Sequence, residues 1–514
     1  MEQYNNLPGF FVDLADDGLQ IMPSMHITDS VTLIGFAEKG PMFTPVRISR
    51  LEEGDAVFGA YHRDGVFNGK SLALGMRQAY GAGCRDIRLV RIPNGTAAEL
   101  EVANIVVTSK GLGAYYNDIK VEITADTFKV WSVEDALLHD EENTVEATYS
   151  VSFATTTTYA ELFADVRDSG APVTLETAEG TSASSALGTV TPAGPSKLST
   201  GEAAVDYSKD NYDTEGKASI RAQVLEAYNG LLGYETDVLV ALPLKIEFDN
   251  DLSTYDFEDA EKLSDFCAQA NTRESRVLGV MSVATKEGSL NSGDITSLIT
   301  GLTGEGAHSN LYPGPNGQDL GKFISITVGD VIFYDNNLGL YSDVPAAAYA
   351  GLITSLNPHS ATTNKVLANA RGLRYSFYPA QLDQLTAARF VTFRNRTGRG
   401  VTVTDGITCA KPLSDFQRLS TLRIANTVIT ITRQVTEPFI GEALDSARKD
   451  SIETAIEGGL RNLRDAGAIS SFEFAVYFDS VQDRIQGILT VEINIVPAFE
   501  VRKIRLKLKL TATQ

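Results

Sequence analysis

The stretches SFEFAVYF, at residues 471–478, and LTVEINIV, at residues 489–496, alternate apolar and polar side chains along nearly their whole length. A period of two is typical of strands that bury one face of a sheet. Before them, apolar residues recur at helical spacing over residues 413–431 and 444–463, and Gly467 is a helix stop signal. The order helix, helix, strand, strand predicts a compact α+β domain over residues 396–495.

The segment that follows, residues 496–514, carries a further alternating pattern. A lone strand has no core of its own, so we expect an arm whose backbone groups pair with another molecule by strand addition. Its basic side either meets acidic groups on a partner or protects an exposed edge from aggregation. The apolar side consists of Ile504, Leu506, Leu508 and Leu510, and the basic residues are Arg502, Lys503, Arg505, Lys507 and Lys509.

Two parts of the chain, residues 26–95 and 201–395, alternate predicted strands with predicted helices. Such alternation predicts an α/β body whose sheet is covered by helices. The predicted strands include residues 31–36, 87–92, 236–242 and 277–281, and the predicted helices include 70–80, 218–232, 259–270 and 346–356.

Residues 96–200 differ from the body because Ser and Thr abound and short β-rich runs recur. They predict an inserted β-rich domain, in which the small polar residues 180–201 read as loop or linker. Residues 1–25 hold too little apolar surface for a core, and we expect an extended arm. The length of 514 residues corresponds to about three domains. The fold class is therefore a multidomain combination of α/β and α+β parts.

Charge and cysteine usage exclude several classes of protein. The formal net charge is -22, with 44 basic against 66 acidic residues, whereas a nucleic-acid binder needs a basic surplus. Cys84, Cys267 and Cys409 lie too far apart for a disulfide framework or zinc motif. The longest apolar runs, such as residues 238–244, are short for a membrane span, and the first residues lack a secretory pattern. We expect cytoplasmic synthesis, with no membrane insertion and no direct nucleic-acid contact.

The candidate motifs for catalysis or cofactor binding lack the required residue types at their essential positions. The sequence GVFNGKS at residues 65–71 suggests a phosphate-binding loop, but Asp64 occupies the position of the first glycine and would repel phosphate. The acidic run over residues 249–259 has Thr254 where a calcium loop needs glycine, and Ala260 where it needs glutamate. We expect no cofactor, no metal and no enzyme activity. An α/β enzyme with residues scattered along the sequence stays an alternative.

Short motifs in the same order along nearly the whole chain resemble those of the contractile phage tail sheath family. Residues 120–215 match poorly, and the family's "PaEfI" ending departs here to Phe499-Glu500-Val501. The matching segments include Pro8-Gly9-Phe10-Phe11-Val12, TLIGFAEKGP at residues 32–41, PFIGE at residues 438–442, GILTV at residues 487–491 and Pro497-Ala498.

The resemblance implies a subunit that polymerises helically around an inner tube and contracts to drive the tube through a bacterial envelope. It implies that both terminal arms exchange strands between subunits, through Pro8, Gly9, Phe10, Phe11 and Val12 at one end and the apolar C-terminal residues at the other. The basic side of the C-terminal arm is then expected to face the tube or a neighbouring subunit. Further implied partners are baseplate and tail terminator proteins, in a virion tail. A different tail or baseplate structural protein is the alternative.

Overall fold

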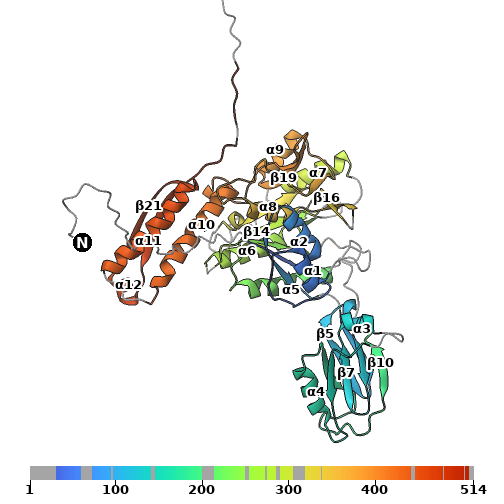
Figure 1. The fold of residues 1–514 in the computed structure, drawn as a ribbon. Coiled ribbons are helices and arrows are strands. Elements are labelled where there is room, and N and C mark those ends of the chain that lie inside the picture. The colour runs from blue at the N-terminus through green and yellow to red at the C-terminus, as the bar shows by residue number, and fades with distance from the viewer. Residues whose placement is uncertain are drawn as a thin grey trace, which may run out of the picture.

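The structure, a computed structural model, describes residues 30–59, 72–93, 96–139, 145–199, 214–248, 254–272, 275–284, 290–304, 319–336, 339–441, 446–478, 480–502 and 504–508. Figure 1 shows a central α/β body, a β-rich unit and a C-terminal unit of helices with a short sheet. The predicted mixture of helices and several sheets is confirmed, whereas the residue limits of the domains stay predictions.

An open, mainly parallel sheet forms the middle of the body. Its order is β2-β3-β1-β11-β14-β15-β19-β20, and only the two outermost strands run antiparallel to their neighbours. Inner strands such as VLVA in β11 are apolar throughout because both faces of the sheet are covered. The strands are β1 (Ser30–Gly35), β2 (Val46–Ile48), β3 (Asp86–Arg91), β11 (Val238–Ala241), β14 (Leu278–Ser282), β15 (Ile324–Val328), β19 (Phe390–Arg396) and β20 (Gly400–Val403).

Helices cover both faces of this sheet, and each face has its own apolar cluster. One face carries α1 (Leu51–Phe58), α2 (Leu72–Gly81) and α8 (Ala346–Ser355). The other face carries α5 (Thr214–Leu231), α6 (Glu258–Thr272), α7 (Ser292–Thr303) and α9 (Pro379–Ala387).

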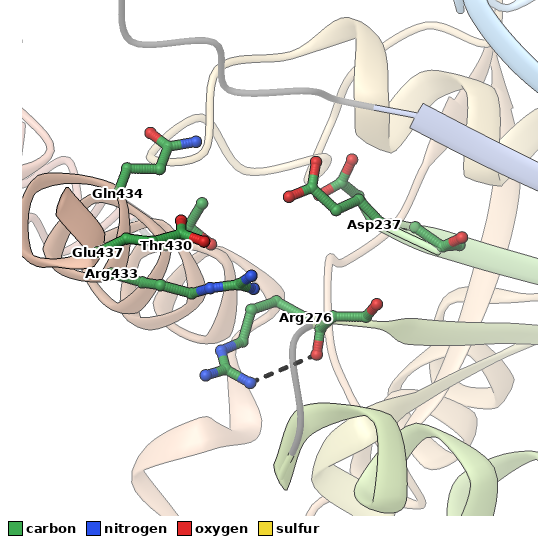
Figure 2. Close-up of a pocket in the computed structure, with 9 residues that line it drawn as sticks. Asp237, Arg276, Thr430, Arg433, Gln434 and Glu437 are labelled. Atoms are coloured by element: carbon green, nitrogen blue, oxygen red, sulfur yellow. Dashed lines mark hydrogen bonds between the residues drawn. The ribbon is translucent and has the colours of Figure 1, made fainter. Parts of the chain in front are cut away.

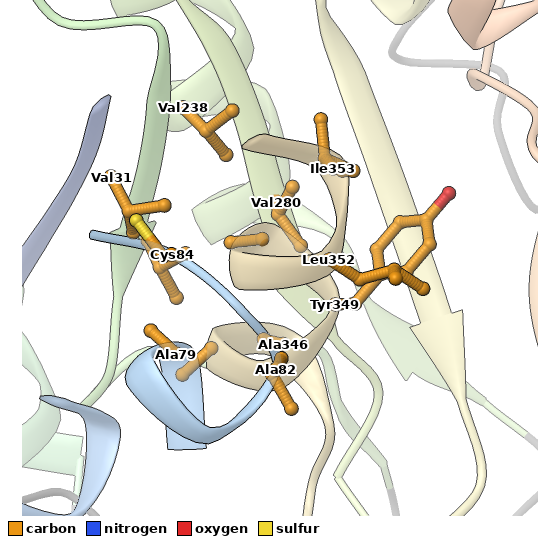
Figure 3. Packing of buried hydrophobic residues seen from close by; sticks show 14 of the residues in the cluster. Val31, Ala79, Ala82, Cys84, Val238, Val280, Ala346, Tyr349, Leu352 and Ile353 are labelled. Atoms are coloured by element: carbon orange, nitrogen blue, oxygen red, sulfur yellow. The ribbon is translucent and has the colours of Figure 1, made fainter. Parts of the chain in front are cut away.

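Small side chains let α8 approach the sheet and α2 closely. The helix reads AAAYAGLITS and is buried from Ala346 to Thr354. Figure 3 shows its side chains against Val238 and Val280 of the sheet and beside Ala79 of α2. A Cβ atom on Gly351 would lie 2.3 Å from the carbonyl oxygen of Ala79, so this position requires glycine.

Short strands complete the body, and 3-10 turns occur in all three units. A three-stranded sheet has the order β17-β16-β18, and β12 pairs with β13. These strands are β12 (Glu247–Phe248), β13 (Tyr255–Asp256), β16 (Val331–Asp335), β17 (Gly339–Asp343) and β18 (Ala370–Leu373), and 3-10 turns occupy η2 (Ala114–Asp118), η5 (Leu320–Phe323), η6 (Asp415–Gln417) and η7 (Glu437–Phe439).

The β-rich unit has two sheets around a separate apolar cluster that runs from Ala98 to Leu198. Strand β10, which reads AGPSK, lies within residues 180–201, so the prediction that this whole stretch is loop or linker is wrong. Its bonds to β6 form the strand, because its own residues have low β propensity. The elements are β4 (Ala97–Val102), β5 (Ile105–Leu112), β9 (Val173–Thr177), β6 (Lys120–Ile123), β7 (Thr127–Trp131), β8 (Tyr149–Ser152), β10 (Ala193–Lys197), α3 (Val133–Leu138) and α4 (Tyr159–Asp168).

Polar contacts join the β-rich unit to the body, one of them buried at Arg91 and another exposed at Glu134. The Arg91 side chain, 1% exposed at the end of β3, donates hydrogen bonds to the carbonyl oxygens of Gly40 and Leu112, both at 2.9 Å. Glu134 of α3 accepts from Lys39 of the body at 2.8 Å. Although burial opposes the effect, hydrogen bonds from Lys39 and Tyr115 lower the pKa of Glu134 to about 2.

The C-terminal unit consists of two long helices and a two-stranded sheet. Helix α10 connects it to the body, because Leu419 and Leu422 belong to the body cluster while Val428 and Ile431 belong to the C-terminal cluster. The guanidinium of Arg423 in α10 also donates to the carbonyl oxygens of Leu356 and Asn357, which directly follow α8. The elements are α10 (Leu419–Thr436), α11 (Ser446–Asp465), β21 (Ile469–Tyr477), α12 (Val481–Gln486) and β22 (Thr490–Pro497).

Candidate assembly interface

The two alternating stretches of the sequence form the antiparallel pair β21–β22. Register places Phe472 opposite Ile495 and Phe474 opposite Ile493, so these side chains share one face. That face packs on α10 and α11 in the C-terminal apolar cluster. The sheet is therefore fixed on one side by its helices, as the period of two predicted.

Within the described ranges, β21 and β22 pair only with each other, so each strand has an unpaired outer edge. An open edge presents backbone N–H and C=O groups to any added strand. The edges of the main sheet differ. β2 has three residues and carries the Arg47–Asp86 ion pair, and β20 is bridged by Val366. Accordingly, the C-terminal sheet offers the better template for strand addition.

The described residues of the C-terminal arm, 498–502 and 504–508, continue from the end of β22 without regular secondary structure (Figure 1). Its described apolar side chains are Ile504, Leu506 and Leu508, which are 88%, 87% and 78% exposed. The described part of the alternating strand predicted here, residues 498–502 and 504–508, has no strand structure in the single chain, because a lone strand finds no hydrogen-bond partner. Exposure of this much apolar surface is unfavourable unless another molecule covers it.

The basic residues of the arm have different surroundings. Arg502 donates a hydrogen bond to Asp405 of its own chain, a contact that the sequence did not predict. Arg505 and Lys507 are exposed. Lys503, Lys509 and Leu510 lie outside the described residues, as do the predicted N-terminal strand-exchange residues Pro8, Gly9, Phe10, Phe11 and Val12.

Solved structures with this architecture are described as sheath tail proteins. The sheath tail protein Lin1278 from Listeria innocua matches with a TM-score of 0.59 at 15% identity, over 92% of each chain. The sheath tail protein DSY3957 from Desulfitobacterium hafniense matches with a TM-score of 0.55 at 12% identity, over 95% of this chain and 100% of that one. The chain has the fold of tail sheath proteins.

A chain in the baseplate structure of the anti-feeding prophage has the same sheath fold, with a TM-score of 0.51 at 12% identity, over 98% of this chain and 99% of that one. No protein-family model matches the sequence, and no curated protein matches it either. The sheath fold is therefore detected through structure, at identities where sequence comparison finds nothing.

A polar pocket lies where α10 of this sheath fold meets the starts of β11 and β14 (Figure 2). Arg276 and Arg433 line it together with the acidic Glu235, Asp237 and Glu437. Burial, with a smaller contribution from Arg433, lowers the pKa of Arg276. Charges of both signs at this joint fit a contact between the C-terminal unit and the body better than a site for one class of ligand.

Other candidate sites have structural roles among the described residues. The Arg221 side chain of α5 forms ion pairs with three carboxylates of the acidic run, those of Asp256, Glu258 and Asp259. Because these carboxylates already have a cationic partner, they do not form a preformed calcium site. In the ranges that the structure covers, no group of three or more His, Cys, Asp or Glu side chains is placed to hold a metal ion. Residues 60–71, with the GVFNGKS sequence, lie outside the description.

The three cysteines are also poor candidates for nucleophilic catalysis. Cys84, Cys267 and Cys409 are buried, and burial raises the pKa of each thiol, to about 12 for Cys409. A thiol with a raised pKa is a poor nucleophile at neutral pH. Of the helices described, none is long and apolar enough to cross a membrane.

Proposed function

We propose that this protein is the structural subunit of a contractile tail sheath, which polymerises helically around an inner tube and contracts to drive the tube through a bacterial envelope. The observation that carries the proposal is a chain with the sheath fold whose exposed apolar arm begins beside a two-stranded sheet with open edges.

In this proposal the C-terminal arm of one subunit adds a strand to β21 or β22 of a neighbour. Ile504, Leu506 and Leu508 alternate with basic residues, so one face of the added strand continues an apolar sheet face and the other stays polar. Five backbone hydrogen bonds at about 0.5–1.5 kcal/mol each supply a few kcal/mol per arm. A head-to-tail contact of this kind builds a helical polymer when successive copies do not close into a ring.

The N-terminal residues 8–12 are proposed as a second strand-exchange arm. A two-stranded sheet has one outer edge on each strand, so two arms from neighbours fit one sheet without competing. Residues 504–508, with Arg505 and Lys507, are proposed to lie near acidic groups of the tube or of an adjacent subunit. The β-rich unit is proposed to lie on the outside of the polymer, which suits its Ser- and Thr-rich composition.

The proposed partners are further copies of this chain, the inner tube protein, and baseplate and terminator proteins at the two ends. The proposed location is a virion tail assembled in the host cytoplasm. No cofactor, enzyme activity, membrane insertion or direct nucleic-acid contact is part of the proposal, and the energy for contraction comes from the assembled state itself.

Electron microscopy of the purified full-length chain tests this function. A sheath subunit is expected to form tubular polymers with a helical repeat, at concentrations where an unrelated acidic protein of equal size stays dispersed. A chain that stays monomeric under all conditions, or forms only closed rings, would instead favour a baseplate component or an unrelated function.

A further inference from the structure

The root of the C-terminal arm, defined here as residues 498–502, is fixed to the rest of the chain. The amide of Ala498 donates a hydrogen bond to the carbonyl oxygen of Ala468 at 3.0 Å. Beyond it, Glu500 and Arg502 contact residues from the body and from the start of α10. The described residues 504–508, with the exposed Ile504, Leu506 and Leu508, follow these contacts along the chain.

The carboxylate of Asp405 is the centre of these contacts. Asp405 is 4% exposed and follows β20 of the main sheet. It accepts hydrogen bonds from Arg418 at 2.9 Å, from the hydroxyl of Thr363 at 3.0 Å, and from Arg502. A buried carboxylate needs such cationic partners, because desolvation otherwise disfavours its charge.

Glu500 is held from the other side. Its carboxylate accepts from Arg418 at 3.3 Å and from the hydroxyl of Ser420 at 3.2 Å. Arg418, at the start of α10, therefore bridges a carboxylate of the body and a carboxylate of the arm root. Two cations and two carboxylates alternate in one partly buried network that joins body, helix and arm.

We propose that Asp405, Arg418, Glu500 and Arg502 form a clamp that fixes the arm root to the body, so that force on the arm reaches the body instead of the sheet β21–β22. The role in bearing force rests on the proposed sheath function, whereas the fixed position of the root does not. The four residues are positioning residues, since the contact with a neighbour is made further along the arm.

The geometry explains why such a clamp is needed. Strand β22 ends at Pro497, and it pairs with only one described strand. A force applied directly at its end would act on this single strand pair, and a two-stranded sheet is only marginally stable by itself. With the root held, the same force acts on several charged contacts together and on the rigid start of α10, whose Leu419 and Leu422 lie in the body core.

Paired spin labels on the full-length chain test the fixed root. Labels are placed at Val501→Cys, an exposed position between the two clamp residues of the root, and at Thr397→Cys, in the exposed turn between β19 and β20. The native cysteines are buried and should not react. The width of the distance distribution between the labels measures how firmly the root is held.

The unaltered root should give one narrow distribution. Arg502→Gln should roughly double its width, because the root loses its ion pair with Asp405 and moves more widely. Arg502→Lys should restore most of the narrow distribution, since a single hydrogen bond from a cation is needed. Arg505→Gln, the matched control, removes the same charge beyond the clamp and should change nothing. An unchanged width in Arg502→Gln, or equal broadening in Arg505→Gln, would overturn the proposal.

A second measurement tests whether the clamp bears mechanical force in assembled tubes. Tubes of Arg502→Gln and of Arg167→Gln, which removes an exposed positive charge from the β-rich unit, are sheared under identical conditions, and the surviving length is scored by electron microscopy. The clamp predicts a loss of at least about half of the surviving length for Arg502→Gln only, because its arm pulls directly on one strand pair. Equal survival would overturn the force-bearing role. If the unaltered chain forms no tubes, the proposed sheath function fails while the spin-label result still decides the fixed root.

Discussion

Gly351 in α8 shows how one residue sets the distance between two elements of the body. Its missing side chain leaves room for the backbone of Ala79 in α2, and an added Cβ would approach that carbonyl oxygen to 2.3 Å. Backbone atoms of a packed helix cannot yield as the end of a flexible side chain can. The close contact between α2 and α8 therefore depends on this glycine.

Gly351→Ala is expected to lower the free energy of unfolding by about 1–3 kcal/mol, because overpacking forces the two helices apart. The measurement is urea denaturation followed by circular dichroism. Gly230→Ala in α5 is the matched control, since its Cβ would meet only one atom at an ordinary 3.6 Å. The control should be neutral or stabilising, as alanine is the better helix former. Equal stability of both variants would contradict the packing argument.

Glu134 gives a prediction about pH. Its pKa is lowered to about 2 in the folded chain, against about 4.3 in an unfolded one. A lowered pKa adds stability above the unfolded value, and this stability is lost as the pH falls from about 4 toward 2. The side chain is 60% exposed, so its pair with Lys39 contributes only about 0.5–1 kcal/mol.

Glu134→Gln should therefore destabilise the β-rich unit at pH 7 by about 0.5–1 kcal/mol, and the difference from the unaltered chain should shrink toward pH 3. Trp131, the only tryptophan, lies buried in β7 and reports unfolding of this unit by fluorescence. Glu179→Gln, at an exposed carboxylate of the same unit, should have no effect at either pH. A difference that persists unchanged at pH 3 would speak against the ion pair.

At the scale of elements, the patterns of the sequence were sufficient where apolar residues alternate with polar ones or form a continuous run. Strands β21 and β22 follow from their alternation, and α8 follows from its apolar run between residues 346 and 356. Strand β10 could not be predicted, because AGPSK carries neither alternation nor β-branched residues and is held in place by β6. The contact of Arg502 with Asp405 was also missed, since 97 residues separate the two and neither belongs to a motif.

Removal of all residues after Pro497 tests the C-terminal arm as an element. The shortened chain should remain folded, because the arm's described residues 504–508 lie in no apolar cluster and are exposed. It should fail to form tubes, since the donated strand is gone. Electron microscopy and circular dichroism on the same sample give both results. Tubes of normal length from the shortened chain would exclude strand donation by this arm.

At the scale of the whole molecule, three units with separate apolar clusters are joined by polar contacts and one shared helix. Arg91 holds the β-rich unit to the body, and α10 extends from the core of the body into the core of the C-terminal unit. Composition and motif order predicted the kinds of unit and the sheath fold. They could not predict the polar contacts between the units, because each of these contacts is made by single residues that are distant in sequence.

Cryo-electron microscopy of the assembled polymer tests the central claim most directly, at a resolution that traces the C-terminal arm. The account predicts that residues 504–508 form a strand hydrogen-bonded to the outer edge of β21 or β22 in a neighbouring subunit, with Arg502 still on Asp405 of its own chain. A polymer in which both edges of that sheet stay unpaired, or in which the arm folds back on its own subunit, would contradict it.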